Sequence, residues 1–261
     1  MATPPDSDPF VTSRRIRSGK SRTGPFSRAA HCVRDGGFAR QAAGESHLRS
    51  CKVVRPGLWN DILEQTSQHL VLVLTAMAIA IAIGVPTGIL LTRRPAWRTP
   101  ILGIANIFQT IPSLALFGFL IPIPFIGGIG PRTAIVALIL YALLPILRNT
   151  LAGILNVDAA VRESAVAMGM TGTQILKQVE LPLASRTILA GIRVATVTTI
   201  GTATIAAAIG GGGLGVFIFR GVASVDTVQI LAGAIPAALI ALISDGGLGW
   251  IERKLSASHS Y

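Results

Sequence analysis

Glu163-Ser-Ala-Val-Ala-Met-Gly169 is followed, after nine residues, by Val179-Glu-Leu-Pro182, and together they form a polar, amphipathic stretch between long apolar segments. A protein that only crosses a lipid bilayer does not need a stretch of this kind between its spans. A membrane protein that receives a mechanical push from a soluble partner does need one. The stretch therefore predicts a membrane fold and a contact with a second protein.

The composition of the chain also favours a membrane protein. Hydrophobic residues make up 51% of the chain and charged residues only 13%, and the mean hydropathy is +0.61. A soluble chain would carry about 25% charged residues. The longest runs that hold neither a charged residue nor a histidine are residues 70–92, 99–131, 133–147, 194–219 and 227–244.

These runs are long enough for membrane-spanning helices, which need about 20 apolar residues each. They lack the alternation of barrel strands, so the sequence predicts an all-α polytopic membrane protein. We expect five spans, at residues 69–92, 101–121, 132–148, 185–208 and 227–248.

The end of the fourth run leaves one alternative open. This run stops at the glycines 210–213, and the apolar piece that follows, residues 214–219, is too short to cross a bilayer. It predicts a short interfacial or re-entrant segment, and a sixth span is the alternative.

Prolines lie inside or at the entrance of every expected span: Pro86, Pro112, Pro145, Pro182 and Pro236. A proline removes a backbone donor and bends a helix. Two interpretations follow, of which one is simple shaping of the bundle. The other is that the prolines act as hinges when the protein alternates between two states.

Capping signals divide the polar stretch, residues 158–182, into two helices. Asp158 is a candidate N-cap for a first helix that ends near Met168. Gly169 can take the left-handed conformation that follows a helix C-terminus. We call this stretch the 158–182 loop.

A capping box opens the second helix of the loop. Thr171-Gly-Thr-Gln174 has the required pattern of a hydroxyl residue and a glutamine three positions later. We expect Leu181 and Pro182 to turn the chain into the next span. The sequence thus predicts a helix–turn–helix projection on one side of the membrane.

The loop resembles the EAA loop of ABC-importer permeases, whose pattern is E-A-A, three residues, G, nine residues, I, one residue, L-P. Ser164 stands for the first alanine and Val179 for the isoleucine. The resemblance implies a type I ABC-importer permease bundle with a cytoplasmic coupling loop. It assigns ATPase coupling to Glu163, Ser164, Ala165, Gly169, Val179, Leu181 and Pro182.

Residues 58–255 as a whole resemble the permease subunits of osmoprotectant importers, which carry glycine betaine, carnitine, choline or proline betaine. The local matches lie at residues 109–113, 141–149, 191–193, 200–204, 210–215 and 231–236. The resemblance implies two cytoplasmic ATPases, a second permease (identical or paralogous) and an extracytoplasmic substrate-binding protein. It also implies a place in a bacterial cytoplasmic membrane.

We expect the chain to be a permease and not an enzyme. It has no G-x-x-x-x-G-K-[ST] pattern, so ATP and Mg²⁺ are expected on the partner ATPase and no cofactor on this chain. Gly210, Gly212 and Gly215 match a dinucleotide-binding pattern, but they follow a membrane helix where that pattern follows a strand. Cys32 and Cys51 have no companion metal ligands, so neither a metal site nor a disulfide is indicated.

Arg193 is the one strong charge well within an expected span. Such a charge is costly in a bilayer and faces a partner inside the bundle, for which Asp245 is the candidate. Gln109, Thr202 and Thr204 are further polar candidates for the bundle interior or the solute pathway. The alternative for Arg193 is that its side chain reaches the inner membrane interface.

Basic residues in the short loops predict the orientation. If residues 149–184 are cytoplasmic, nine basic residues of the spanning part lie inside, and only Arg132 and Arg220 lie outside. With five spans, the C-terminus, including the short tail 256–261, is cytoplasmic and the N-terminus is external.

The first 57 residues conflict with this orientation, because they hold 11 of the 23 basic residues and only four acids. They are rich in Ser, Gly and Pro and cannot bury enough apolar surface to fold alone. We expect a disordered tail without a nucleic-acid partner. An overextended gene start, with true initiation near Val53 or Val54, is the alternative.

Two other functions remain open from the sequence. A permease of the same design could carry another small solute, such as an amino acid. An ion-coupled secondary carrier would need buried acids along its path. The expected spans contain almost no acids, which weighs against the carrier.

Overall fold

The computed structural model describes residues 58–123 and 128–257. The expected tail at residues 1–57 lies outside the described residues, as do residues 258–261 of the expected C-terminal tail. Ser256 and Ala257 belong to the last helix.

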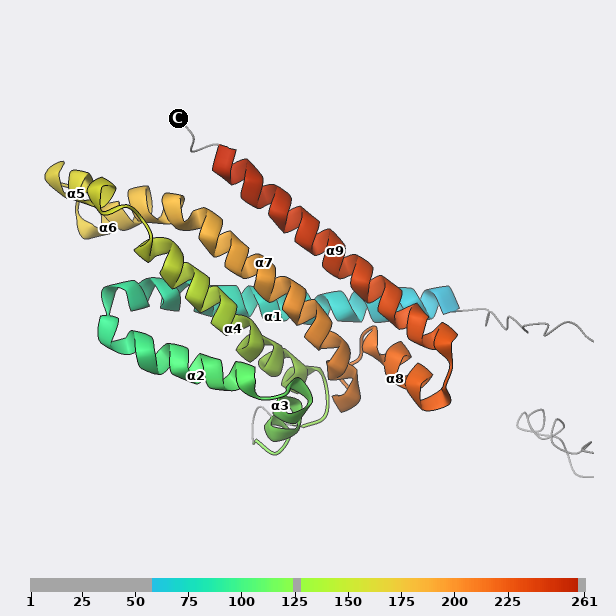
Figure 1. Ribbon diagram of the computed structural model, residues 1–261. Coiled ribbons are helices and arrows are strands. Elements are labelled where there is room, and N and C mark those ends of the chain that lie inside the picture. The colour runs from blue at the N-terminus through green and yellow to red at the C-terminus, as the bar shows by residue number, and fades with distance from the viewer. Residues whose placement is uncertain (1–57, 124–127, 258–261) are drawn as a thin grey trace, which may run out of the picture. The chain divides into compact units, whose positions relative to one another are not determined.

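Helices account for the regular structure of the described residues, in which no strand occurs (Figure 1). The all-α prediction is therefore confirmed. The helices are α1 (Leu58–Arg93), α2 (Arg98–Thr110), α3 (Ser113–Leu120), α4 (Pro131–Leu155), α5 (Ala159–Ala167), α6 (Gly172–Gln174), α7 (Leu181–Ile205), α8 (Gly215–Ser224) and α9 (Thr227–Ala257). Short 3-10 turns at Pro95–Trp97 and Ala206–Ile209 and a π-helical segment at Ile175–Glu180 complete the order.

Four helical stretches in the described part are long and apolar enough to cross a bilayer: Trp59–Arg93, Pro131–Leu155, Gly172–Ile209 and Thr227–Lys254. They contain the first, third, fourth and fifth expected spans. Several of them are longer than expected, because their polar ends continue the same helix. Helix α1, with 36 residues at 1.5 Å per residue, is about 50 Å long, whereas the hydrocarbon core of a bilayer is about 30 Å thick.

The second expected span, residues 101–121, is not a single straight helix. It is broken between α2 and α3, and the helical piece Pro95–Thr110 meets Ser113–Leu120 at an angle of 104°. Ile111 and Pro112 are extended at the break. A residue before a proline is driven out of the helical region, and the proline itself supplies no backbone donor. The total is five spans if this bent pair counts as one, and four otherwise.

A short helix, α8, takes the place of the expected short segment after the glycine cluster. Its ten residues extend about 15 Å, too little to cross a bilayer, so the described chain offers no sixth span here. Gly210, Gly212 and Gly213 have positive φ values of 75°, 75° and 80° and allow the chain to leave α7 and enter α8.

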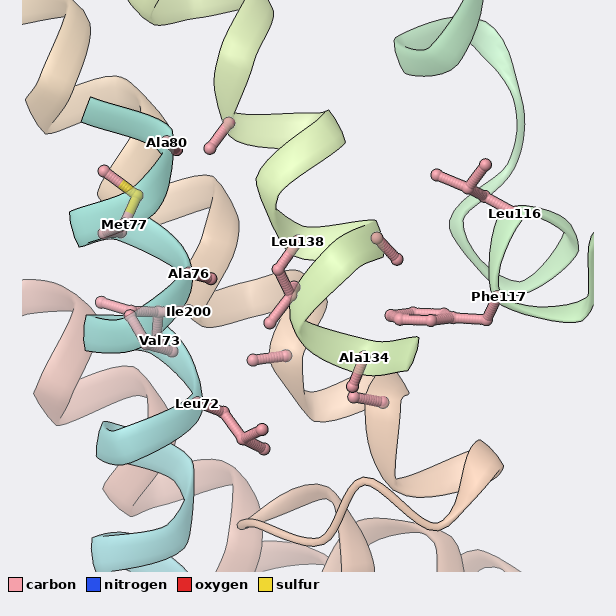
Figure 2. Close-up of a cluster of buried hydrophobic side chains, with 14 of the residues drawn as sticks. Leu72, Val73, Ala76, Met77, Ala80, Leu116, Phe117, Ala134, Leu138 and Ile200 are labelled. Atoms are coloured by element: carbon pink, nitrogen blue, oxygen red, sulfur yellow. The ribbon is translucent and has the colours of Figure 1, made fainter. Parts of the chain in front are cut away.

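The core lies where α1, α3, α4 and α7 meet, and α4 packs against both α1 and α7 (Figure 2). Alanines such as Ala76, Ala80 and Ala134 are fully buried there beside Leu138 and Phe117. Small side chains let helix backbones approach closely, which is how helices associate in a membrane. The alanines therefore bring the helices together, and larger side chains such as Leu138 and Phe117 fill the remaining space.

Glycines mark the close crossings of α4 with α1 and α7. A Cβ atom at Gly88 on α1 would lie 2.7 Å from Thr150 on α4, and one at Gly191 on α7 would lie 2.4 Å from Asn149. Both distances are below contact, so α1 and α7 are each held tightly against the same part of α4. This arrangement fixes the three helices around which the site described below is built.

Candidate functional site

Helix α5 forms the first arm of the 158–182 loop, as predicted. The Asp158 carboxylate accepts a hydrogen bond from the Ala160 backbone N–H at 2.9 Å, which makes Asp158 the N-cap. The helix ends at Met168, and Gly169 has a φ of 77°. Residues other than glycine rarely take this conformation, so Gly169 defines the turn between the two arms.

The second arm begins with the predicted capping box. The Thr171 backbone N–H donates to Gln174 Oε1 at 2.7 Å, and the Gln174 backbone N–H donates to Thr171 Oγ1 at 3.4 Å. These reciprocal bonds satisfy two donors at a helix N-terminus that would otherwise lack partners.

The expected turn at Leu181 and Pro182 is wrong. The chain stays helical from Gly172 to Ile209, and the π-helical segment leads directly into α7. A π turn just before a proline redirects the hydrogen bonds that the proline ring interrupts, so the helix passes through Pro182 without ending. The second arm of the loop and the spanning helix α7 therefore form one continuous helix.

The residues assigned to coupling fall into two groups. Glu163, Ser164 and Gly169 are exposed on the first arm and the turn, whereas Ala165 is buried between the arms. Val179, Leu181 and Pro182 are half-buried along the second arm. The first group offers a surface to another protein, and the second group attaches that surface to the membrane helices.

Apolar residues that the sequence did not single out are exposed beside Glu163. The side chains of Val166 and Met168 are 59% and 74% exposed and lie on α5 and at its C-cap. Exposed apolar groups next to a charge are typical of a protein-binding surface. The signal that could have found them is their place on the polar arm, outside every membrane span.

Glu180 was also missed, although it lies between two residues of the motif. Its side chain is 2% exposed, and each carboxylate oxygen contacts a different arginine. Arg93 Nη2 donates to Oε2 at 2.8 Å, and Arg162 Nε lies 2.9 Å from Oε1. The acid is thus neutralised by α1 on one side and by α5 on the other.

Figure 1 shows α5 and α6 together at one end of the helices, where α1 and α4 also end, and away from α3 and α8. The C-terminal residues of α9 lie toward the same end. Most basic residues of the spanning part belong to these helix ends, among them Arg93, Arg94, Arg98, Arg148 and Arg162. One end of the helices is therefore strongly basic and also carries the loop.

A second charged cluster joins α7 to α9. Arg193 donates to both carboxylate oxygens of Asp245, and Arg193 Nη1 lies 3.6 Å from Glu252 Oε2. An open pocket of about 450 Å³ is lined by Arg193, Asp245, Glu252 and residues of α7. The structure places Asp245 beside Arg193, where the sequence had named it as the candidate partner.

The other polar candidates do not join this cluster. Thr202 and Thr204 donate to the backbone oxygens of Thr198 and Gly201 of their own helix. Thr202 lies nine residues beyond Arg193 on α7, which is about 14 Å along the helix axis. Gln109 is exposed near the end of α2.

A family model described as "Binding-protein-dependent transport system inner membrane component" matches residues 80–257. The carnitine transport permease protein OpuCB of Listeria monocytogenes is 47% identical over 197 residues, which are 76% of this chain and 89% of that protein. The choline transport system permease protein OpuBB of Bacillus subtilis is 44% identical over 196 residues, which are 75% of this chain and 89% of that protein. The osmoprotectant import permease protein OsmW of Salmonella typhimurium is 44% identical over 192 residues, covering 73% and 87%.

Solved structures show the same arrangement of helices. An inward-facing structure of the MetNI methionine ABC transporter aligns with a TM-score of 0.69 at 25% identity and covers 77% of this chain and 98% of that chain. A crystal structure of an amino acid ABC transporter with histidines aligns with a TM-score of 0.64 at 18% identity, covering 75% and 94%, and shows likeness of fold alone.

Proposed function

Because this chain belongs to the family of binding-protein-dependent transport system inner membrane components, it is a permease subunit of an ABC importer, and we propose that it carries osmoprotectants. The proposed solutes are glycine betaine, carnitine, choline, proline betaine or a close relative. The membrane is the cytoplasmic (inner) membrane of a bacterium.

One observation carries the proposed solute class. The chain is 44–47% identical to permeases named for carnitine and choline, over most of the length of those proteins. Its sequence identity to the methionine transporter is only 25%, although the two proteins share the same fold. The amino-acid alternative is therefore less well supported, and it is kept as one arm of the test.

We propose that the 158–182 loop is the coupling element. Its exposed first arm offers Glu163, Val166 and Met168 to a partner, and its second arm continues without a break into α7. A force applied to the loop would therefore be passed to α7 along one uninterrupted helix. This continuity supports coupling better than the turn that the sequence suggested at Leu181 and Pro182.

The proposed partners follow from this role. Two cytoplasmic ATPases would bind ATP and Mg²⁺ and contact the loops of two permeases, of which the second is identical to this chain or paralogous. An extracytoplasmic binding protein would deliver the solute. The chain itself is proposed to perform no chemistry.

The proposed orientation places the loop and the C-terminus in the cytoplasm. The end of the helices that carries the loop also carries most of the basic residues, which stay on the cytoplasmic side of a membrane. With α2 and α3 counted as one span, residue 58 is then on the external side.

The decisive experiment is transport by the complex in proteoliposomes. The permease, its ATPase and its binding protein are reconstituted, and uptake of labelled glycine betaine, carnitine and choline is compared with uptake of methionine and histidine. Osmoprotectant uptake that needs internal ATP and survives collapse of the proton gradient is expected. Uptake of the amino acids alone would overturn the solute class, and dependence on the proton gradient would overturn the coupling proposal.

A further inference from the structure

We propose that Glu180 is a positioning residue for coupling, which transmits displacement of the 158–182 loop to α1 and α4 as well as to α7. The inference rests on the proposed coupling function of the loop. It adds a second route by which the loop would act on the membrane helices. The first route is the continuous helix formed by the second arm and α7.

The geometry of the carboxylate suits a junction between elements. Its Oε1 contacts Arg162 of α5, and its Oε2 accepts a hydrogen bond from Arg93, the last residue of α1. Glu180 itself ends the π-helical segment from which α7 starts. One buried side chain thus holds α5 and the start of α7 to the end of α1, which lies 87 residues before Glu180 in the sequence.

Arg162 extends the junction to a fourth element. Its Nη2 donates to the backbone oxygen of Ile154 at 3.1 Å, and Ile154 lies in the last turn of α4. Basic side chains are favourable at a helix C-terminus, because the last carbonyl groups lack partners within the helix. The first arm of the loop is therefore held to α4 by a hydrogen bond and to Glu180 by an ion pair, both made by the same guanidinium.

The end of α1 is ordered firmly enough to receive a displacement. Arg98 donates from Nε to the Leu91 oxygen at 2.8 Å and from Nη2 to the Thr92 oxygen at 2.9 Å. These bonds tie the last turn of α1 to the start of α2. A force on Arg93 would consequently act on a helix end whose last carbonyl groups are hydrogen-bonded.

Movement of α1 would pass on to the core. Cβ atoms at Gly84 and Gly88 would lie 2.8 and 2.7 Å from Ile146 and Thr150 of α4, so the two helices interlock at this crossing. A helix held this closely cannot slide along its neighbour without repacking. Displacement of the cytoplasmic end of α1 would therefore be shared with α4.

Stability alone does not account for a charge at this position. Replacing a buried ion pair by apolar residues of similar size is often neutral or stabilising. A carboxylate that accepts a hydrogen bond from Arg93 and forms an ion pair with Arg162 does something that an apolar side chain cannot, because it holds α1 and α5 to the start of α7 by charge. Apolar packing would allow these elements to slip when the loop is pushed.

The test measures coupling separately from assembly. Glu180→Gln keeps the size of the side chain and removes its charge, and Arg93→Ala removes the link to α1 at a half-exposed position. In proteoliposomes of the complete complex, the number of solutes imported per ATP hydrolysed should fall roughly tenfold in Glu180→Gln, since a lost charge-assisted contact shifts an equilibrium by about that factor. The fall should be smaller in Arg93→Ala, because Arg93 is 44% exposed and Glu180 keeps its pair with Arg162. Arg94→Ala is the matched control, because Arg94 is the next residue, carries the same charge and is exposed.

The double variant Glu180→Gln/Arg93→Ala should be no worse than Glu180→Gln alone, because Glu180→Gln already removes the ion pair with Arg93 together with the one to Arg162. If the complexes assemble in smaller amounts but import the normal number of solutes per ATP, Glu180 only supports folding and the inference is wrong. Should Glu180→Gln fail to assemble, Arg93→Ala alone decides in the same way. A wild-type complex that shows no ATP-driven uptake would instead overturn the proposed function itself.

Discussion

Arg193 on α7 and Asp245 on α9 form a bidentate ion pair, with Nε–Oδ1 and Nη2–Oδ2 distances of 2.6 Å each. The pair joins two helices that are 52 residues apart in sequence. The guanidinium also lies over Gly249, where a Cβ atom would be 3.0 Å from Arg193 Nη1. The lack of a side chain at Gly249 thus leaves room for the Arg193 guanidinium within the spanning part.

Removing one partner of this pair should impair the protein more than removing both. Asp245→Asn leaves an arginine whose charge is no longer neutralised by Asp245, which is costly in a membrane. We expect lower thermal stability in detergent and reduced uptake, partly restored in Arg193→Gln/Asp245→Asn. Arg193→Lys should be intermediate, because lysine keeps the charge but not the two parallel bonds. Equal defects in the single and double variants would show that the pair is not energetically coupled.

Substitution of Gly169 should separate backbone strain from obstruction of the partner. Gly169 has a φ of 77°, so any other residue costs about 1 kcal/mol, yet no atom lies within 4 Å of an added Cβ. Gly169→Ala should therefore reduce transport slightly, whereas Gly169→Arg should abolish it by placing a bulky cation at the docking surface. Both variants should reach the membrane in normal amounts, as measured by immunoblotting. Normal coupling of ATP hydrolysis to uptake in Gly169→Arg would mean that the 158–182 loop is not the coupling element.

Reversing the charge of Glu163 should weaken the ATPase contact. The side chain is exposed on the first arm, so the interaction is partly screened by solvent and the loss should be smaller than for Gly169→Arg. Glu163→Lys should lower substrate-stimulated ATPase activity and uptake together, with a larger defect at low ionic strength. Lys254→Glu, which lies in the last turn of α9 and outside the loop, serves as the control and should transport normally. A defect that does not change with salt would argue against a charge contact.

Filling the crossing at Gly191 should destabilise the bundle. A Cβ atom there would lie 2.4 Å from Asn149 Cβ and 3.0 Å from the Pro145 backbone oxygen, so α4 and α7 would have to separate. We expect Gly191→Ala to cost about 1–3 kcal/mol of stability, the range for overpacking a tight site. Gly201→Ala is the matched control, because it lies on the same helix with nothing within 4 Å of the added atom. Thermal unfolding in detergent should rank Gly191→Ala clearly below Gly201→Ala, and equal midpoints would show that the crossing is looser than described.

Topology can be mapped at two positions. A reporter enzyme fused after Lys254 should be cytoplasmic, because basic residues dominate the end of the helices where α9 finishes. A cysteine or epitope tag placed at Ile129, which is 79% exposed before α4, should react with an impermeant reagent from outside. Labelling on the opposite sides would overturn the proposed orientation.

Local signals explain most of the elements that the sequence predicted correctly. The apolar runs specify spanning helices, since length and hydropathy act within each segment. The caps at Asp158 and Thr171 formed as predicted, because each depends on donors no more than three residues away. The short segment after residues 210–213 likewise follows from its own length.

Two prolines had structural effects that the local sequence could not predict. Pro112 breaks the second expected span at an angle of 104°, whereas α7 runs through Pro182 after a π-helical segment. A proline thus interrupts the helix at one position and lies within an unbroken helix at the other. The difference depends on whether neighbouring turns and packed helices can satisfy the interrupted hydrogen bonds, which the sequence near each proline does not reveal.

The sequence by itself therefore determined the membrane class, the positions of most spans and the caps at Asp158 and Thr171 that open the two arms of the loop. The sequence named Asp245 as a candidate partner for Arg193, but the tertiary structure decided which charges meet: Glu180 with Arg93 and Arg162, and Arg193 with Asp245 and Glu252. Contacts between residues 52 or 87 positions apart depend on how the helices pack, and packing arises from the shapes of many side chains at once. A single acid such as Glu180 carries no mark in the sequence that distinguishes a buried junction from an exposed surface charge.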